Sequence, residues 1–348
     1  MKTIVFTLSD DYFFDIFHPV YQELKKYKGL EVFFMYSSQG YGIAWKDKIV
    51  KYLLERGVSE DYIIPSRDNS IVPDMVISAE MHPTISLPES CKEAIKVQMY
   101  HGVDTHDFIS NLENLSKYDT HLSIGPQFNA YFNTLKKVNA TVQIYNVGFP
   151  KTDELFFHNK TNNKQRIIAY IPHWKHYASL HVFKRNIVDV LCADPNNTII
   201  ICPHNHLFIQ GNRDEWLTLF SELSATYSNL LVYYIADNNQ HYKCADLIIT
   251  DLNSSSSLEG NITGVPVITY IGAKNQIEPT RNDLIDRIIE TNYTFNSLHQ
   301  LDDLLSSKDL QPKPIAQTLL DDHLYNHGSA TLAAVKIILE KLLLCNTI

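Results

Sequence analysis

The sequence has little positive charge and no long apolar segment. It contains 30 Lys and Arg against 39 Asp and Glu, a formal net charge of −9. Because nucleic-acid binding needs clustered cations to neutralise phosphates, we expect no nucleic-acid partner. No run approaches the roughly 18 apolar residues that cross a bilayer. The apolar start, residues 3–7, is too short for a signal peptide and is expected to form the first strand.

Cysteines are also few and irregularly spaced. The chain has five, without any CxxC pair: Cys91, Cys192, Cys202, Cys244 and Cys345. An odd number of scattered cysteines favours a reducing compartment over a disulfide framework, so we expect a cytoplasmic protein. Hydrophobic residues make up 45% of 348 positions, enough to bury sizeable cores. The length favours two domains of about 150 residues each.

Short runs of Val, Ile, Phe and Tyr alternate with helix-like segments along the whole chain. This alternation is typical of βαβ units around a mostly parallel sheet. The expected strands of the first half are residues 3–8, 30–37, 74–80, 95–102, 120–125 and 141–148. Those of the second half are residues 165–172, 197–204, 230–236, 245–251 and 265–270. The sequence therefore predicts two similar α/β halves.

A polar, Asn-rich stretch over residues 151–166 is expected to link these halves. We predict an N-terminal, acceptor-side Rossmann-like domain over residues 1–155 and a C-terminal nucleotide-binding one over 165–325. Residues 326–348 are predicted to form a closing helix that packs back on the first domain. Ser329 or Thr331 is expected to cap its N-terminus.

Unusual residues follow four of the expected strands, at the end where open α/β sheets bind ligands. They are His101 and Gly102; Pro172, His173, Trp174 and Lys175; Pro203, His204 and His206; and Asp251 before the serines at 254–257. A histidine at a strand end commonly just bonds a backbone carbonyl. His101 is a better candidate general base, because the glycine after it permits close approach and imidazole titrates near neutral pH.

Two other features of these loops indicate a phosphate ligand. Ser254 and Ser255 precede an expected helix, whose first N–H groups and dipole attract anions. Lys151 and Lys175 would add positive charge locally. Cys202, His204 and His206 occupy alternate positions, so on an extended segment they would point to one side and could bind zinc. No fourth ligand stands at a suitable spacing, however. We therefore expect neither a metal nor a cofactor, and assign His204 to a phosphate or hydroxyl contact.

Five blocks between residues 97 and 270 follow one another in a recognisable order. They are Tyr100-His101-Gly102, residues 148–153, residues 170–175, Cys202-Pro203-His204, and Asp251 with Ser254, Ser255 and Glu259. Together they resemble the CDP-glycerol glycerophosphotransferases of teichoic acid and capsule polymer synthesis, which show W-H-G, G-Y-P-R-N-D, Y-A-P-T-W-R, R-P-H and D-Y-S-S before an acid. Here Lys151, Lys175 and Cys202 stand where that family has arginine.

The resemblance implies a GT-B fold, in which two doubly wound Rossmann-like domains face an inter-domain cleft. It also implies transfer of glycerol phosphate from CDP-glycerol to a hydroxyl acceptor, a polyol phosphate or a glycan, in cell-surface polysaccharide biosynthesis. A lipid-linked acceptor would bring the protein to the inner face of the cell membrane as a peripheral protein. The chain nevertheless shows no basic amphipathic helix of the membrane-surface kind.

The resemblance also implies roles for individual residues. His101 would activate the acceptor, and His204 would contact the donor phosphates. Ser254 and Ser255 would bind the diphosphate and Glu259 the ribose. The other residues assigned to donor binding are Asp251, Pro172, Lys175 and Lys151. Those assigned to the acceptor or to other parts of the cleft are Gly102, Asp153 and His173.

Two alternatives remain open from the residues themselves. The first is a nucleotide-sugar enzyme of the same fold, a GT-B glycosyltransferase or a UDP-sugar 2-epimerase. An epimerase needs several acid/base carboxyls, for which Asp104, Asp107 and Asp153 are available. The second is a degenerate, non-catalytic protein that binds a nucleotide or polymer, which the uncharged Cys202 favours.

Overall fold

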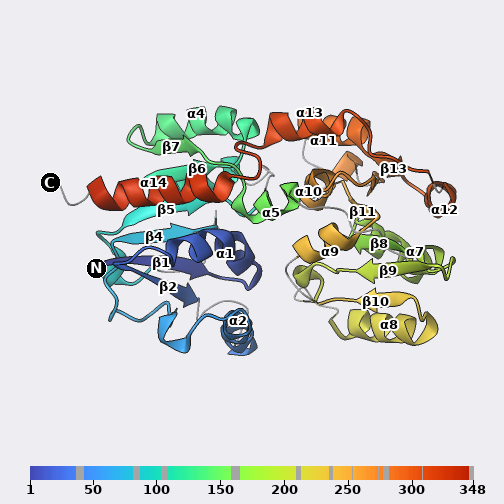
Figure 1. The fold of residues 1–348 in the computed structure, drawn as a ribbon, viewed down its shortest axis with the longest axis horizontal. Coiled ribbons are helices and arrows are strands. Elements are labelled where there is room, and N and C mark those ends of the chain that lie inside the picture. The colour runs from blue at the N-terminus through green and yellow to red at the C-terminus, as the bar shows by residue number, and fades with distance from the viewer. Residues whose placement is uncertain are drawn as a thin grey trace. The chain divides into compact units, whose positions relative to one another are not determined.

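The protein consists of two compact units, and the chain passes from one to the other twice (Figure 1). The computed structural model describes residues 1–36, 43–80, 87–102, 108–157, 165–208, 213–234, 238–252, 254–272, 274–276, 282–307 and 309–344. The first unit comprises Met1–Glu154 together with Asp322–Ile348, and the second comprises Leu155–Asp321. Each unit is built around one parallel sheet.

The sheet of the first unit has seven strands in the order β3-β2-β1-β4-β5-β6-β7. Its strands are β1 Lys2–Leu8, β2 Leu30–Tyr36, β3 Ile63–Pro65, β4 Met75–Ser78, β5 Ile95–Met99, β6 Thr120–Ser123 and β7 Gln143–Asn146. The central β1 is fully buried from Val5 to Leu8. Burial on both faces explains why it reads as a continuous apolar run.

The sheet of the second unit has six strands in the order β10-β9-β8-β11-β12-β13. They are β8 Arg166–Ile171, β9 Asn197–Ile201, β10 Leu230–Val232, β11 Leu247–Asp251, β12 Val267–Tyr270 and β13 Tyr293–Phe295. All neighbouring strands run parallel, as they do in the first sheet. The prediction of two doubly wound α/β domains is therefore confirmed.

Helices connect the strands and cover both sheets (Figure 1). They are α1 Tyr12–Leu24, α2 Ile43–Glu55, α3 Leu112–Leu115, α4 Asn129–Val138, α5 Asp153–Phe156, α6 Ser179–Phe183, α7 Arg185–Leu191, α8 Arg213–Thr226, α9 Asn239–Cys244, α10 Ser256–Ile262, α11 Asn282–Thr291, α12 Leu298–Ser306, α13 Ala316–His323 and α14 Ala330–Leu344. In the first unit, Phe14 of α1 packs its ring 5.2 Å from that of Phe34 on β2. Phe17 lies 4.7 Å from Phe6 on β1. Such aromatic contacts fix α1 over the centre of the sheet.

The last segment of the chain returns to the first unit, where α14 packs against α1. The backbone N–H groups of Ala330 and Thr331 donate to the two carboxylate oxygens of Asp153, at 3.0 and 2.7 Å. Ser329 stands just before the helix, but its hydroxyl donates to the carbonyl of Asn326. The predicted cap by Ser329 or Thr331 is therefore wrong, because a carboxylate 177 residues away in sequence satisfies these N–H groups instead.

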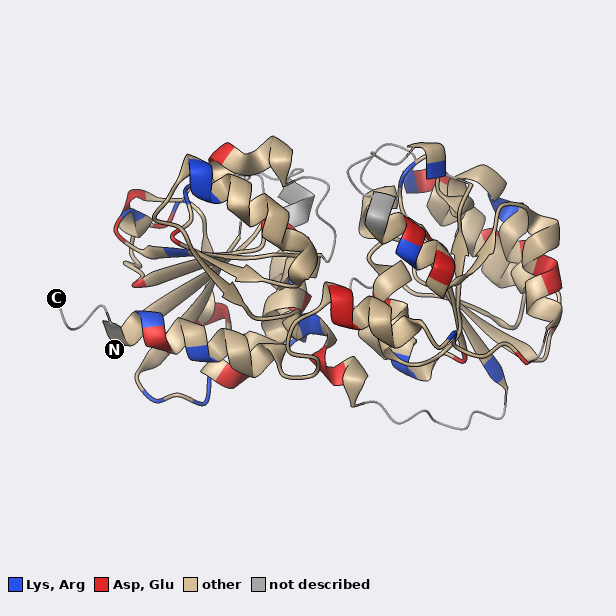
Figure 2. Ribbon diagram, turned by 90° about the horizontal axis from the view of Figure 1, so that it is seen from above, with Lys and Arg blue, Asp and Glu red and all other residues tan. Residues whose placement is uncertain are grey.

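Acidic and basic positions both occur along the helices of the two units (Figure 2). Lys51 pairs with Glu55 on α2, and Lys336 with Glu340 on α14, each at the i,i+4 spacing that places two side chains on one helix face. Within the residues described above, no helix is both long and apolar enough to span a membrane.

Candidate functional site

The loops that leave the second sheet at its carboxyl end carry most of the predicted site residues of this half. The strands β9, β8 and β11 are neighbours in that order. Since parallel strands all end on the same side of a sheet, the loops after Ile201, Ile171 and Asp251 lie next to one another. Ligands of open α/β sheets bind at this end, which we call the carboxyl end of the sheet.

A group of aromatic side chains forms at the carboxyl end of the second sheet. The His173 ring lies 5.8 Å from that of His204, and His204 lies 5.1 Å from His206. Trp174 contacts both sides of this group, with ring centroids 5.6 Å from His173 and 5.3 Å from His206. Lys175 holds its Nζ 4.0 Å from the centroid of the Trp174 ring, as in a cation–π contact. Three predicted residues, His173, Lys175 and His204, are thus brought together.

Backbone hydrogen bonds set the tautomers of two of these histidines. The N–H of Lys175 donates to Nδ1 of His173 at 3.2 Å, and the N–H of His206 donates to Nδ1 of His204 at 3.1 Å. A ring nitrogen that accepts a hydrogen bond carries no proton, so each neutral imidazole has its proton on Nε2. His173 and His204 are therefore hydrogen-bond donors through Nε2 without carrying a positive charge.

Asp251, at the end of β11, holds the loop that follows β8. Its two carboxylate oxygens accept the backbone N–H groups of His173 at 2.6 Å and Ser179 at 2.8 Å. The side chain is 1% exposed. Burial raises the pKa of Asp251 to about 6 even though both N–H donors favour the carboxylate. These contacts give Asp251 a structural role, and its direct contact with a ligand stays a prediction.

The serine run forms the turn between β11 and α10. The hydroxyl oxygen of Ser254 accepts the N–H of Ser256 at 3.3 Å, and the Ser254 carbonyl accepts the hydroxyl of Ser257 at 2.7 Å. The Ser255 carbonyl accepts the N–H groups of Leu258 and Glu259, which begins the helix. The serines thus satisfy the polar groups of a tight turn, a role that small hydroxyl residues commonly fill.

Glu259 lies on α10 and is 3% exposed. It accepts a hydrogen bond from the hydroxyl of the fully buried Tyr242 on α9 at 3.2 Å. A second buried contact fixes the same helix, because the side-chain amide of Asn261 donates to Asn292 at 3.0 Å. Gly260 also lets α10 approach the sheet, since a Cβ there would lie 3.2 Å from Val267. The position of Glu259 is therefore set by packing on all sides of α10.

Cys202 is placed in the interior rather than at a metal site. Its thiol is 2% exposed, and burial raises its pKa far above the ordinary range. The chain turns into a short 3-10 helix at Asn205–Phe208, so the alternation that the zinc alternative required does not exist. Among the residues that the structure describes, no three His, Cys, Asp or Glu side chains are grouped to hold a metal ion.

His101 lies at the carboxyl end of the first sheet, directly after β5 and Tyr100. Its Nδ1 donates to the carbonyl of Ala79, which follows the neighbouring β4, at 2.8 Å. Its ring packs 6.3 Å from that of Tyr12 and 5.4 Å from that of Phe13, at the start of α1. With Nδ1 donating, the lone pair of the neutral ring lies on Nε2, which is the nitrogen that can accept a proton.

Three acids at the same end of the first sheet were missed by the sequence analysis. Asp10 and Asp11 follow β1 and are each 3% exposed, and Glu80 follows β4 and is 5% exposed. Buried carboxyls are rare unless paired, and those with shifted pKa values cluster at functional sites. Burial is the main cause that raises the pKa of both Asp10 and Asp11, the latter to about 7. The available signal was an acid two or three residues after the end of an apolar strand.

The remaining predicted residues lie elsewhere. Lys151 and Asp153 belong to the first unit, where the Asp153 carboxylate caps α14. Gly102 and Pro172 are buried beside His101 and His173 in sequence. Asp104 and Asp107 fall outside the described residues. Asp153 is thus occupied by backbone N–H groups, which does not suit the acid/base role weighed for it.

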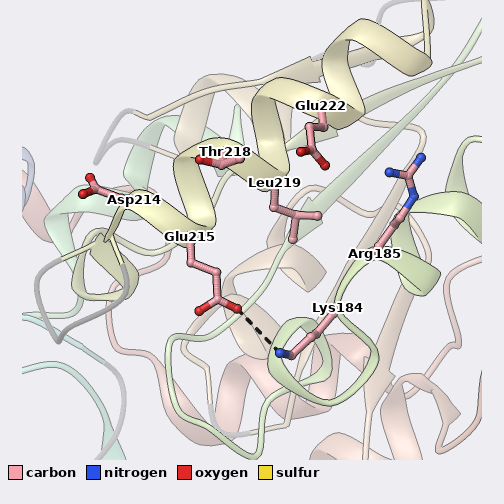
Figure 3. Close-up of a pocket in the computed structure, with 7 residues that line it drawn as sticks. All are labelled: Lys184, Arg185, Asp214, Glu215, Thr218, Leu219 and Glu222. Carbon is pink, nitrogen blue, oxygen red and sulfur yellow. Dashed lines mark ion pairs between the residues drawn. The ribbon is translucent and has the colours of Figure 1, made fainter.

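A separate hollow of about 520 Å³ lies between the start of α7 and one face of α8 (Figure 3). It contains none of the strand-end residues. Lys184 and Arg185 form one wall, and Lys184 Nζ lies 3.6 Å from Glu215 on the other. Both of these side chains are more than half exposed, so we assign the hollow no part in the candidate site.

Neither a protein-family model nor a curated protein sequence matches the chain. Solved structures do match. UDP-GlcNAc 2-epimerase from Neisseria meningitidis bound to UDP-GlcNAc is 13% identical, with a TM-score of 0.60, over 99% of this chain and 100% of that one. The Methanocaldococcus jannaschii enzyme with UDP-GlcNAc and UDP is 16% identical, with a TM-score of 0.54, over 98% and 100%. MnaA from S. aureus with UDP is 13% identical, with a TM-score of 0.61, over 99% and 98%.

These matches overturn the resemblance to CDP-glycerol glycerophosphotransferases, and with it glycerol phosphate transfer, CDP-glycerol, teichoic acid and capsule synthesis. The structure shows why the motifs misled. Asp153 caps a helix, Asp251 holds a loop and Cys202 fills the core, so three of the five blocks contain residues with structural roles. Such structural roles follow from the fold and carry no information about which substrate binds. The chain has the GT-B fold that UDP-GlcNAc 2-epimerases share.

Proposed function

We propose that the chain is an enzyme that binds a UDP-sugar and inverts one carbon of its sugar, as a UDP-sugar 2-epimerase does. The observation that carries this proposal is a fold likeness over 98–99% of the chain to epimerases solved with UDP-GlcNAc. The likeness includes both units rather than one nucleotide-binding half. It therefore supports a shared substrate class more than a likeness of a single Rossmann-like domain would.

The carboxyl end of the second sheet supports binding of the nucleotide diphosphate. His173 and His204 carry Nε2 protons there, and Lys175 adds a positive charge beside Trp174. A chain of net charge −9 must bind an anion through such local donors. Ser254 and Ser255 are proposed to contact the diphosphate and Glu259 the ribose.

The carboxyl end of the first sheet supports the inversion step. Inverting a carbon requires that a proton leaves one face and that a proton arrives at the opposite face, so a base and an acid are both needed. Asp10, Asp11, Glu80 and His101 lie after the neighbouring strands β1, β4 and β5. A raised carboxyl pKa suits such a group, because it can then exchange a proton near neutral pH.

Glycosyl transfer from the same UDP-sugar is a second candidate. His101 favours it, because one histidine with its lone pair on Nε2 is sufficient to activate an acceptor hydroxyl. This reaction inverts or retains the anomeric carbon and leaves the other sugar carbons untouched. The two candidates therefore differ in whether a sugar C–H bond exchanges with solvent.

Calorimetric titration with UDP, UDP-GlcNAc, CDP and CDP-glycerol tests the nucleotide part. We expect UDP and UDP-GlcNAc to bind more tightly than the cytidine ligands. His204→Gln should weaken UDP by about tenfold, the effect of losing one hydrogen bond to a charged group. His176→Gln is the matched control, because His176 is exposed on the same loop as His173. Preference for CDP, or no binding at all, would reject the proposal.

Proton NMR of UDP-GlcNAc incubated with the protein in D₂O tests the reaction. Epimerisation should replace one sugar C–H by C–D and produce a second isomer. Release of UDP without deuterium in the sugar would instead favour glycosyl transfer. Binding without either change would support the non-catalytic alternative.

A further inference from the structure

Lys175 is a half-buried lysine whose ammonium group lies over an aromatic ring. Its Nζ is 4.0 Å from the centroid of the Trp174 ring. Within the described part of the chain, this ammonium group has no ion pair with a carboxylate and no hydrogen bond. A cation–π contact stabilises the charge but does not use the three N–H donors of an ammonium group. The N–H donors of Lys175 are therefore available to a ligand with oxygen acceptors.

Lys313 shows how a cation over a ring is held when its role is structural. Its Nζ lies 5.3 Å from the Tyr293 ring and donates to the carbonyls of Glu290 and Asn292 at 3.1 and 2.7 Å. These bonds tie Lys313 to the end of α11, so its ammonium group is used within the fold. Lys175 lies closer to its ring and has no second partner among the described residues. The contrast indicates that Lys175 is placed for a ligand.

The Trp174 ring is itself fixed by its neighbours. It stacks on His173 at an interplanar angle of 27°, with ring centroids 5.6 Å apart, and the His206 ring meets it edge-on at 5.3 Å. The backbone is held as well, because Nε2 of His181 on α6 donates to the Trp174 carbonyl at 3.0 Å. The His181 ring packs in turn 4.9 Å from that of Trp216 on α8. A fixed ring can therefore set the position of a flexible lysine.

This ammonium group belongs to the carboxyl end of the second sheet. His173 follows β8 and His204 follows β9, and each carries its proton on Nε2. Lys175 differs from both neutral imidazoles in carrying a full charge. A lysine has many side-chain conformations, so fixing it on an anion costs conformational entropy. A ring that restricts these conformations beforehand should strengthen anion binding.

We propose that Trp174 is the positioning residue that holds the Lys175 ammonium group against the phosphates of the ligand, and that it thereby sets the preference for a nucleoside diphosphate over a monophosphate. This inference rests on the proposed function, in which a UDP-sugar binds at this end of the second sheet. Lys175 contacts the phosphates, whereas Trp174 acts through Lys175. UDP carries more negative charge than UMP, so a fixed cation favours UDP.

Calorimetric titration with UDP, UMP and uridine tests this role. Trp174→Leu should lower the ratio of UDP affinity to UMP affinity about two- to fivefold, the effect of losing a cation–π contact near the surface. Uridine has no phosphate, so its binding should not change. Trp174→Phe keeps a ring beneath the ammonium group and should restore most of the ratio. Trp174 is half-buried, so both variants should fold.

A double variant tests whether Trp174 acts through Lys175. Lys175→Met alone should lower the same ratio about tenfold, the effect of losing a hydrogen bond to a charged group. Adding Trp174→Leu should lower the ratio no further, because the ring then has no cation to hold. Tyr293→Leu is the matched control, since it removes the ring beneath Lys313 in the same unit. It should leave the ratio at its wild-type value.

The outcomes separate this inference from the proposed function. If the wild type prefers UDP and Trp174→Leu keeps the same ratio, or loses UDP, UMP and uridine equally, the positioning role is overturned and the proposed function stands. Additive losses in the double variant would also overturn it, because Trp174 would then contact the ligand directly.

Inorganic pyrophosphate, which has neither base nor sugar, covers the case in which the wild type does not bind UDP. Weaker pyrophosphate binding in Trp174→Leu than in the wild type would then support the positioning role and reject the proposed function. A wild-type protein that binds neither UDP nor pyrophosphate would overturn both.

Discussion

The two units have the same parallel-sheet architecture but different side chains at their carboxyl ends. In the first unit these are the buried acids Asp10, Asp11 and Glu80. In the second unit they are neutral hydrogen-bond donors such as His204, and a buried acid that ends a strand, Asp251, accepts two backbone N–H groups. An acid after a buried strand can therefore hold a loop or hold a proton. Its hydrogen-bond partners, rather than its place in the sequence, decide which.

The largest expected effect tests whether the acids of the first unit act only in the chemical step and not in UDP binding. Glu80→Gln should lower turnover of UDP-GlcNAc at least about 100-fold, because an amide cannot exchange a proton. UDP affinity should stay within about twofold of wild type, because the proposed phosphate donors belong to the other unit. Glu93→Gln, an exposed change in the same unit, is the control. Equal losses of binding and turnover in Glu80→Gln would end the division of roles between the units.

A glycine substitution tests whether the units are independent in stability. Gly148 has φ +94°, and a Cβ there would lie 2.1 Å from the carbonyl oxygen of Tyr325. Gly148→Ala should destabilise the first unit by about 3 kcal/mol, because overpacking adds to backbone strain. Gly29→Ala has a similar φ of +89° but open space, so it should cost only about 1–2 kcal/mol. If the units are independent, calorimetry should show two transitions, of which only that of the first unit moves; a common shift of both would contradict independence.

A pH titration of stability tests the structural role of Asp251. Its pKa is about 6 in the folded protein, above the ordinary value of 3.8 for an aspartate, so the folded state binds the proton more tightly. Stability should therefore fall as pH rises from about 4 to 6, by on the order of 2 kcal/mol. Asp251→Asn should remove this slope in urea unfolding curves. A slope that persists in the variant would assign the titration to another group.

The smallest expected effect concerns Asp153, an acid of the first unit with a structural role. Asp153→Ala removes the carboxylate that accepts the N–H groups of Ala330 and Thr331, so the loss should be about 1–2 kcal/mol. Ser329→Ala should cost under about 0.5 kcal/mol, since that hydroxyl bonds only a nearby carbonyl. Urea unfolding measures both. Similar losses in the two variants would mean that the serine shares the capping.

The strands were predictable because a parallel sheet buries both faces of its strands. All eleven expected strands are confirmed, including β1 and β11 at the centres of the two sheets. The two that were missed, Ile63–Pro65 and Tyr293–Phe295, are three-residue strands at sheet edges. Three residues are too few to carry a periodic pattern. The three-residue edge strand β10 was found only because the apolar run that contains it extends over residues 230–236.

The site was predictable only where sequence position alone places a side chain. His101, His173 and His204 were located because each follows a strand, and strand ends of one sheet gather. The Asp10–Asp11 pair was not found, because two acids before a helix have the pattern of an N-cap. The ion pair between Asp11 and Lys48 joins α1 to α2, so it cannot be inferred from neighbouring residues in the sequence. For the same reason the capping role of Asp153 was taken for a place in the site.

The return of α14 to the first unit has a consequence for how the protein is made. The first 154 residues leave the ribosome long before Ala330–Leu344. This later helix packs against α1, and its first N–H group donates to Asp153. Domains generally fold as units while the chain is synthesised. Here the unit translated first is completed last, and until then the surface of α1 that α14 covers is exposed to the cell. A nascent chain should therefore expose this surface of α1 until Ala330–Leu344 has been synthesised.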